Sequence, residues 1–198
     1  MKTKNVLAIF ALSGLLSIVA CNEKQKSNST QNKKTIAQNV TQSKKEKKKQ
    51  PTIYEFTSVD KGFSSLTSTI NTVGLVKTLN GSGPYTIFAP VNLAFDKLEE
   101  GVIKKMIESK NKEQLRTILE YHIVPRIITK EDIMIAVNRG SGSVKLTTMN
   151  GILLTARIKE DQVFLVDESG NGGYVIATDT KVSNGLIHSI DAVMMPKK

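Results

Sequence analysis

The hydrophobic pattern of this chain changes its period after Gly140, and this change limits the folds that the chain can adopt. Upstream, apolar residues recur every three or four positions, as they do on one face of a helix. Downstream, apolar and polar residues alternate, as they do on a strand with one buried face. Helices followed by neighbouring strands are typical of the α+β class. We therefore predict an α+β fold with N-terminal helices and a C-terminal strand meander.

The helical part begins with an apolar face of five residues. They recur at helical spacing: Val59, Phe63, Leu66, Ile70 and Val73. Thr57 and Ser58 stand at the start of this face, and both residue types accept hydrogen bonds from the first N–H groups of a helix. We expect a helix to begin there. Further helices are expected at 75–79, 92–95, 102–107 and from 113 to 122, where Leu115, Ile118, Leu119 and His122 share one face.

A tight turn organises the strand part. Asn150-Gly151 separates an alternating run that ends at Thr148 from one that begins at Ile152. Asn-Gly between two such runs favours a β-hairpin, because both residues tolerate positive φ. Other strands are expected at 85–90, 163–166, 174–178 and 186–195, the last one stopping at Pro196.

The N-terminus has the pattern of an export signal. Lys2 and Lys4 precede an apolar run of about 15 residues, which is shorter than the roughly 20 that a membrane-spanning helix needs. The run ends in Leu-Ser-Ile-Val-Ala before Cys21, and this ending resembles the bacterial lipobox. The resemblance implies that residues 1–20 are a signal peptide and that a lipid is attached to Cys21. The alternative is an ordinary secretory signal with an unmodified cysteine.

Residues 21–50 are predicted to be a disordered linker behind this anchor. Between 22 and 50 the chain has nine lysines, two glutamates and few apolar residues, so it cannot bury enough surface to offset its ordering entropy. The lysine run at 44–49 has two interpretations, a solvated spacer or a contact with anionic head groups or acidic polysaccharide. The anchor implies attachment to the cell membrane or outer membrane, on the periplasmic or cell-surface side.

The remaining residues, 51–198, are predicted to form one domain without disulfide bonds, since Cys21 is the single cysteine. The net charge of +10 comes mostly from the lysines that precede this domain. The domain itself carries 17 basic and 16 acidic residues, and a near-neutral domain gives no indication of nucleic-acid binding.

Three motifs in the domain occur in a fixed order. They are TIFAPVNLAF at 86–95, YHIV at 121–124 and NGLIHSIDAVMMP at 184–196. Their order and spacing resemble the signature boxes of fasciclin domains. The resemblance implies a β-wedge of two sheets with N-terminal helices wrapped around it. It also implies a non-enzymatic module of cell adhesion or extracellular matrix.

The resemblance implies roles for two groups of residues. The first supports the fold: Phe88, Pro90, Asn92, Phe95, Asn184, Gly185 and His188. Pro90 is expected to end a strand, Asn92 to cap the next helix and Asn184-Gly185 to form a turn that permits positive φ. The second group lies where partners bind in the family: Tyr121, His122 and Asp191. Residue patterning alone favours a core position for His122, because it shares an apolar helical face.

One loop resembles half of a calcium site. Asp167, Ser169 and Asn171 alternate before Gly172, as in the first half of an EF-hand loop. Thr178 stands where the bidentate glutamate is required, so we predict a polar hairpin loop with no metal. The sequence also has no G-x-S-x-G or H-E-x-x-H motif, and we predict no enzyme activity and no cofactor.

The sequence therefore predicts a lipid-anchored binding module of the cell envelope. Its membrane partner is lipid through Cys21, and its further partner is a protein or polysaccharide in adhesion or surface contact. The domain is expected to be monomeric. The alternative is an envelope accessory protein that binds a small molecule or a protein partner.

Overall fold

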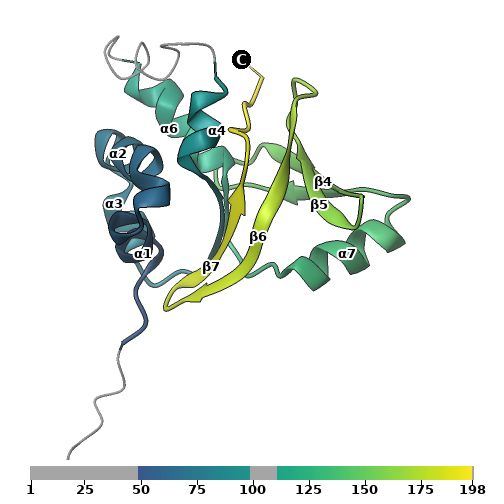
Figure 1. The fold of residues 1–198 in the computed structure, drawn as a ribbon, viewed down its shortest axis with the longest axis horizontal. Helices are drawn as coiled ribbons and strands as arrows, with labels where there is room; N and C mark the ends of the chain where they lie inside the picture. The colour runs from purple at the N-terminus through teal and green to yellow at the C-terminus, as the bar shows by residue number, and fades with distance from the viewer. Residues whose placement is uncertain (1–48, 99–110, 198) are drawn as a thin grey trace, which may run out of the picture. The chain divides into compact units, whose positions relative to one another are not determined.

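The computed structural model describes residues 49–98 and 111–197 of the chain. The predicted signal peptide, Cys21, nearly all of the linker and the predicted helix at 102–107 lie outside the described residues. Helices precede a strand meander, as predicted (Figure 1). Two strands, β1 (Tyr85–Pro90) and the short β2 (Ile123–Val124), come between helices in the sequence.

Short helical segments open the domain and pack against one another. Their bounds are α1 (Ile53–Val59), η1 (Lys61–Phe63), α2 (Ser64–Val73) and α3 (Val76–Leu79). The predicted start at Thr57 or Ser58 is wrong. The Thr52 side chain accepts from the Glu55 N–H, and the Glu55 carboxylate accepts from the Thr52 N–H at 2.8 Å. This capping box starts the helix at Ile53, several residues earlier than the apolar spacing suggests.

The first predicted helix is also divided in two. The Asp60 carboxylate accepts a hydrogen bond from the Gly62 N–H at 2.8 Å and starts η1, so α1 ends at Val59. As a result Val59 is 80% exposed, which contradicts its predicted place on the buried face. The other members of that face are buried as predicted: Phe63, Leu66, Ile70 and Val73.

Within residues 49–98 and 111–197, seven strands form a continuous sheet in the order β2-β1-β7-β6-β5-β4-β3. Their bounds are β1 (Tyr85–Pro90), β2 (Ile123–Val124), β3 (Val144–Thr147), β4 (Leu153–Lys159), β5 (Gln162–Val166), β6 (Gly172–Val182) and β7 (Gly185–Ile190). The Asn150-Gly151 hairpin is confirmed, with Thr147 opposite Leu153. The last strand ends at Ile190 rather than at Met195. It runs parallel to β1, and all other neighbours are antiparallel.

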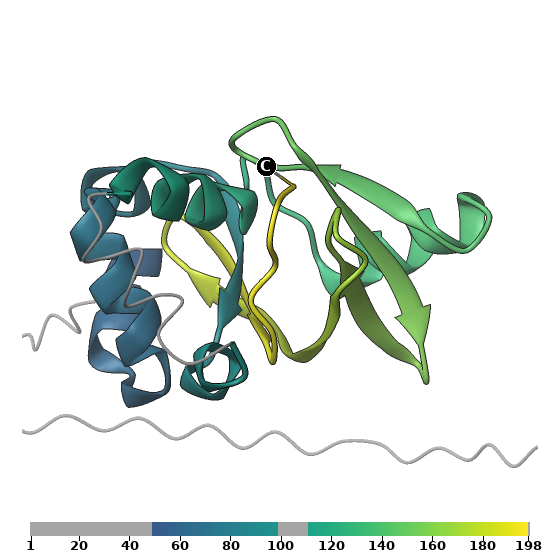
Figure 2. The same ribbon diagram turned by 90° about the horizontal axis from the view of Figure 1, so that it is seen from above.

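The sheet has two halves that share β6. Its first residues, from Gly172 to Tyr174, pair with β5, whereas the residues from Val175 to Val182 pair with β7. Register shifts interrupt the β6–β7 pairing, and such irregularities bend a strand. The two predicted sheets are therefore the two arms of one bent sheet, and Figure 2 shows them diverging from β6 and β7.

The other helices of the described residues are α4 (Asn92–Asp96), α6 (Lys112–Tyr121) and α7 (Lys130–Arg139). The first two were predicted, and the whole apolar face of α6 is buried. The apolar spacing did not predict α7. Its signal is a second capping box, in which the Thr129 side chain accepts from the Asp132 N–H and the Asp132 carboxylate accepts from the Thr129 N–H. Ile133 and Val137 then lie one turn apart and are both buried.

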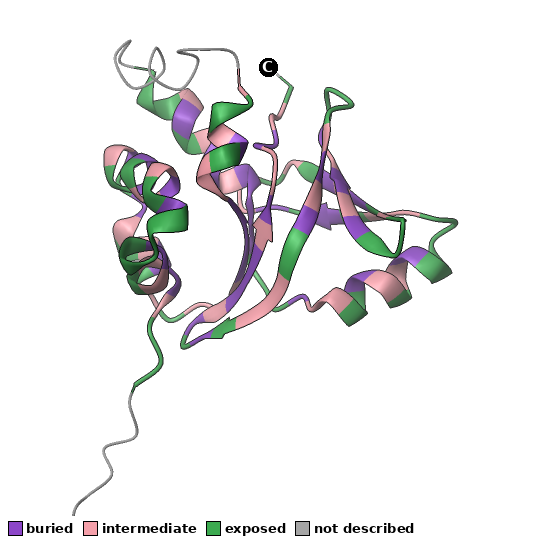
Figure 3. Cartoon of the chain, in the orientation of Figure 1, coloured by how far each residue is buried: buried purple, intermediate pink, exposed green. Residues whose placement is uncertain are grey.

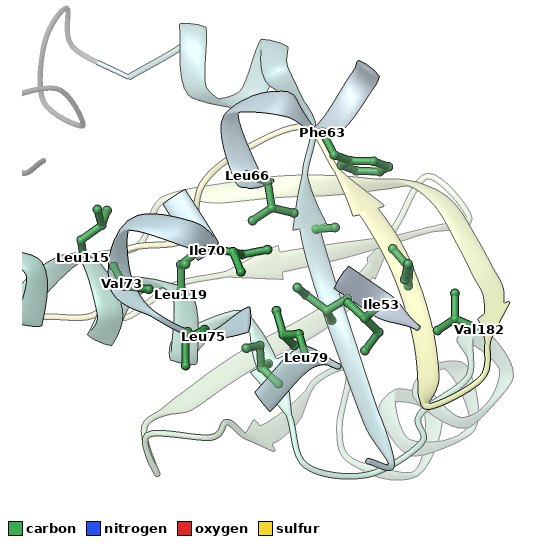
Figure 4. Packing of buried hydrophobic residues seen from close by; sticks show 14 residues of the cluster. Ile53, Phe63, Leu66, Ile70, Val73, Leu75, Leu79, Leu115, Leu119 and Val182 are labelled. Atoms are coloured by element: carbon green, nitrogen blue, oxygen red, sulfur yellow. The ribbon is translucent and has the colours of Figure 1, made fainter. Parts of the chain in front are cut away.

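Two main cores lie on opposite faces of β1 and β7. The first joins the N-terminal helices to Ile87 and Ile187, and Figure 4 shows side chains from α2, α3 and α6 converging on it. The second contains Phe88 and Ile190 and fills the space between the arms of the sheet, above α7. Since both strands are buried on both faces, they are purple along most of their length in Figure 3.

Candidate functional site

Tyr121 and His122 both lie in the protein interior, with 0% of each side chain exposed. The Tyr121 hydroxyl donates to the Leu153 carbonyl at 3.1 Å. Burial, with smaller contributions from the charges of Glu168 and Asp167, raises the pKa of Tyr121 to about 12. The hydroxyl therefore stays protonated, and it ties the end of α6 to β4.

Both ring nitrogens of His122 bond to the backbone. Nδ1 lies 2.7 Å from the Ile118 carbonyl oxygen, and Nε2 accepts from the Met194 N–H at 3.0 Å. A carbonyl requires a donor, so Nδ1 carries the proton and the ring is neutral. Burial lowers the pKa of His122 to about 4, against the opposing effects of the Ile118 carbonyl and Asp167. The position predicted from the helical pattern, a satisfied core histidine, agrees with this geometry.

Asp191 is the only predicted partner-binding residue of the three that reaches solvent, with 29% of its side chain exposed. Its Oδ1 accepts from the Tyr174 N–H at 2.7 Å, and its Oδ2 lies 2.9 Å from the Lys97 ammonium. Lys97 also donates to the Asp191 carbonyl at 2.8 Å. The carboxylate thus joins the end of β7 to β6 and to the end of α4. The three predicted residues do not form one exposed site.

His188 is a second buried histidine with both nitrogens engaged. Nε2 lies 2.8 Å from the Ile128 carbonyl oxygen, and Nδ1 accepts from the Asp179 N–H at 3.2 Å. The ring stacks on Phe88, its register partner on β1, with 5.3 Å between centroids. Burial lowers the pKa of His188. The side chain therefore ties β7 to the segment before α7.

Asn184 and Gly185 hold the N-terminal helices against the sheet. The Asn184 side chain accepts from the Ile53 N–H at 2.9 Å and donates to the Leu79 and Gly81 carbonyls at 2.7 and 2.8 Å. Neither Asn184 nor Gly185 has positive φ, so the predicted reason for this pair is wrong. Gly185 is required because a Cβ atom there would lie 1.9 Å from the Tyr85 carbonyl oxygen.

Three residues of the first box also have local roles. Pro90 ends β1, as predicted, and Phe95 is partly buried against two of the apolar clusters. Asn92 does not cap α4, whose cap residue is Val91. Its side chain instead accepts from the Ser65 N–H at 3.1 Å and donates to the Lys61 carbonyl at 2.8 Å. It stabilises the junction between η1 and α2.

The polar spacing from Asp167 to Asn171 resembles a calcium loop, but hydrogen bonds to the backbone explain it. The Asp167 carboxylate accepts from the N–H groups of Ser169 and Asn171, both at 2.9 Å, and from the Met195 N–H at 3.0 Å. These bonds build a tight loop and attach the C-terminal segment to it. Over residues 49–98 and 111–197, no cluster of three or more His, Cys, Asp and Glu side chains is arranged to hold a metal ion.

The described part of the domain surface has several cavities, among them one beside α6 and one beside β3. The first, of about 500 Å³, lies between α6 and the C-terminal segment and is lined by Gln114, Thr117, Ile118, Ser169, Met195, Pro196 and Lys197. The second, of about 310 Å³, lies beside β3 and is lined by Arg126, Ile127, Ile128, Asp132, Ile133, Ala136, Val144 and Leu146. Neither cavity is predicted by the apolar sequence patterns, because these patterns do not indicate α7 and do not place the C-terminal segment on α6.

None of the helices in the described part of the chain has the length and apolar character needed to span a membrane.

Comparisons with known proteins agree on one family. A model of the Fasciclin domain family matches residues 61–196. Protein sll1483 of Synechocystis sp. is 36% identical over 145 residues, which are 73% of each chain. The cell surface glycolipoprotein MPB83 of Mycobacterium bovis is 31% identical over 134 residues, covering 67% of this chain and 53% of the relative.

A solved structure has the same fold. It is the FAS1 domain pair of the insect cell adhesion molecule Fasciclin I, with a TM-score of 0.65 and 21% identity over 72% of this chain and 50% of that one. At 21% identity this similarity shows a shared fold. With the family match to residues 61–196, it leads to one conclusion: this chain belongs to the fasciclin domain family.

Proposed function

We propose that this chain is a non-enzymatic binding module of the cell envelope, held at a membrane by a lipid on Cys21. The observation that carries the proposal is that the polar side chains of the signature motifs bond to the backbone of the domain itself. His122, His188 and Asn184 are buried and fully engaged, so they suit a rigid scaffold rather than a reaction. The names of the relatives, a cell surface glycolipoprotein and a cell adhesion molecule, support a surface role.

In this proposal the lysine-rich segment 21–50 holds a monomeric domain away from the cell membrane or outer membrane. The domain then meets a protein or polysaccharide partner through its exposed surface. Tyr121 and His122 stabilise the domain that carries this surface and do not contact the partner, since their side chains are buried. Asp191, which is partly exposed, remains a proposed contact residue.

The anchor is tested by changing Cys21→Ser and fractionating cells that express the full chain. We expect the wild type in the membrane fraction with a lipid mass on its N-terminal cysteine, and the variant in the soluble or precursor fraction. Asn22→Ala is the matched control and should behave as wild type. A mature wild-type N-terminus that carries no lipid would contradict the anchor.

The binding role is tested with the purified domain and with intact cells. We expect labelled domain to bind cells, matrix proteins or glycan arrays saturably. External trypsin should release the domain from intact cells by cutting the lysine-rich segment if the domain faces outward. A domain that binds none of these surfaces would contradict the adhesion role.

The cavity beside α6 favours one alternative, a domain that binds a small molecule. Its volume of about 500 Å³ lies within the usual range for ligand pockets, and its walls combine apolar atoms with the Gln114 and Lys197 side chains. A defined small molecule that raises Tm of the wild type, but not of Thr117→Trp, would support this alternative. The control is Glu113→Trp, which places the same side chain at an exposed position on the same helix.

A further inference from the structure

β3 forms one edge of the sheet, and half of its backbone groups point outward. The Thr148 N–H donates to the Ile152 carbonyl at 3.1 Å and closes the hairpin. Hydrogen-bonded pairs alternate along an antiparallel ladder, so Leu146 and Val144 also bond to β4. Lys145 and Thr147 therefore direct their N–H and C=O groups away from β4, and these groups bond to no other described residue.

The opposite edge of the sheet comes close to β3 at one end. The Met149 N–H, just beyond β3, donates to the Ile123 carbonyl of β2 at 2.7 Å. The cleft of about 310 Å³ is lined by the chain from Arg126 to Ile128, by α7 and by β3. β3 and α7 lie at the same end of the domain in Figure 2. An open strand edge thus runs along an open cleft.

The two faces of β3 differ in chemistry. Val144 and Leu146 line the cleft together with the apolar residues Ile128, Ile133 and Ala136. Two charged residues, Arg126 and Asp132, also line it, and the Asp132 carboxylate is bonded to Thr129. Lys145 lies on the other face and is exposed. Side chains of a strand added at this edge would alternate in the same way. Apolar residues would enter the cleft, and acidic residues would lie opposite Lys145.

Charge also disfavours a second copy of this chain as the occupant. Two β3 edges in antiparallel pairing would bring their Lys145 side chains onto one face at close range. Like charges across a strand pair are destabilising, and lysine on an edge strand is a common means of preventing self-association.

We propose that the β3 edge binds an extended peptide by strand addition, and that the peptide alternates apolar and acidic residues. The backbone of Lys145 and Thr147 supplies the hydrogen bonds, and the cleft and Lys145 select the sequence. The proposal deepens the proposed function, on which it rests, by naming a partner class and the surface that it meets.

Synthetic peptides test the proposal on the wild-type domain. The probe alternates valine with glutamate, and the charge control alternates valine with lysine. A third peptide has the probe sequence with N-methyl groups on alternate backbone nitrogens, which removes the donors of one edge. We expect binding of the probe alone, with at least about tenfold weaker binding of each control.

A matched pair of variants locates the site. Lys145→Pro and Lys145→Ala remove the same charge, but only proline removes the outward N–H. Because that N–H does not bond to β4, an edge position tolerates proline. We expect Lys145→Ala to weaken probe binding modestly and Lys145→Pro to weaken it by a further factor of about ten. Thermal unfolding and circular dichroism check that both variants fold.

Three results of the binding measurements would overturn the proposal. They are no binding of the probe at millimolar concentration, equal binding of the N-methylated peptide, and equal affinity of the two Lys145 variants. The N-methylated peptide keeps the test decisive if Lys145→Pro does not fold. A dimer that Lys145→Pro dissociates would assign the edge to a second copy and would also overturn it. If the probe fails but the wild-type domain still binds cells, this inference falls and the proposed function stands.

Discussion

The Nε2 atom of His122 accepts a hydrogen bond from the backbone N–H of Met194, 72 positions later in the chain, at 3.0 Å. Through this bond the end of α6 holds the segment that follows the last strand. Only the neutral imidazole can accept it, because protonation would place a second N–H donor opposite the first. The attachment of the C-terminal segment therefore depends on the charge of one buried ring.

This geometry predicts that acid destabilises the domain. The pKa of His122 is lowered from 6.5 to about 4 in the folded state by burial. Between these values the unfolded chain binds a proton that the folded domain does not, so stability falls as pH falls. Denaturant unfolding at a series of pH values should show that titration of His122 lowers the free energy of unfolding by about 3 kcal/mol between pH 6.5 and 4. His188, whose pKa is also lowered, should add to the loss.

The control for this prediction is His122→Gln, whose amide offers a donor and an acceptor but does not titrate in this range. The variant should lose free energy of unfolding at pH 7 and show a shallower pH dependence below 6.5. An unchanged slope would assign the acid sensitivity to other groups.

Asn184→Ala should lower the free energy of unfolding by about 3 kcal/mol, measured by urea titration. The change leaves the Ile53 N–H and the Leu79 and Gly81 carbonyls without their partner, and unpaired buried groups cost about 1–3 kcal/mol each. Asn71→Ala, at an exposed asparagine that accepts from the Tyr54 hydroxyl, is the control and should cost less than about 1 kcal/mol. Equal effects would refute the buried role.

Gly185→Ala should disrupt the parallel pairing of β1 with β7. Its Cβ would lie 1.9 Å from the Tyr85 carbonyl oxygen, which is backbone and cannot rotate away. We expect a large fall in Tm or an insoluble product. Gly62→Ala meets only the Asp60 side chain at 3.1 Å and should be tolerated. A folded Gly185→Ala domain with wild-type Tm would contradict the close approach.

Asp167→Asn should destabilise the domain by about 2 kcal/mol, because charge-assisted bonds to the Ser169, Asn171 and Met195 N–H groups weaken. Glu168→Gln, at the exposed neighbour, is the control. Millimolar calcium should leave the Tm of the wild type unchanged, since backbone donors already occupy the Asp167 carboxylate. A calcium-dependent rise in Tm that Asp167→Asn abolishes would instead indicate a calcium site at Asp167.

The sequence predicted the parts of this fold that depend on local patterns. The alternating run around Asn150-Gly151 and the apolar face of α6 both correspond to elements of the domain. Pattern reasoning failed where a polar cap overrides apolar spacing. Val59 fits the helical face by spacing, but the Asp60 cap ends α1 and exposes it. The Thr129–Asp132 capping box indicates the start of α7, which the apolar spacing alone does not.

Predictions of residue roles depended on contacts between distant segments. The buried position of His122 followed from its helical face, whereas its bond to Met194 could not be read from the sequence. Gly185 was expected to need positive φ, but its constraint is the approach of Tyr85. The β3 edge and its cleft involve residues from Arg126 to Leu146, which meet only once the sheet is formed.

The position of β7 has a consequence for when the domain can form. Among the strands of the described residues, β7 is synthesised last, yet it lies in the sheet between β1 and β6 and is buried on both faces. Until it emerges, β1 has only the two-residue β2 as a neighbour, and both cores lack a wall. A nascent chain therefore has no stable intermediate with the full sheet. The domain can therefore complete its fold only after β7 has been synthesised and is free to enter the sheet.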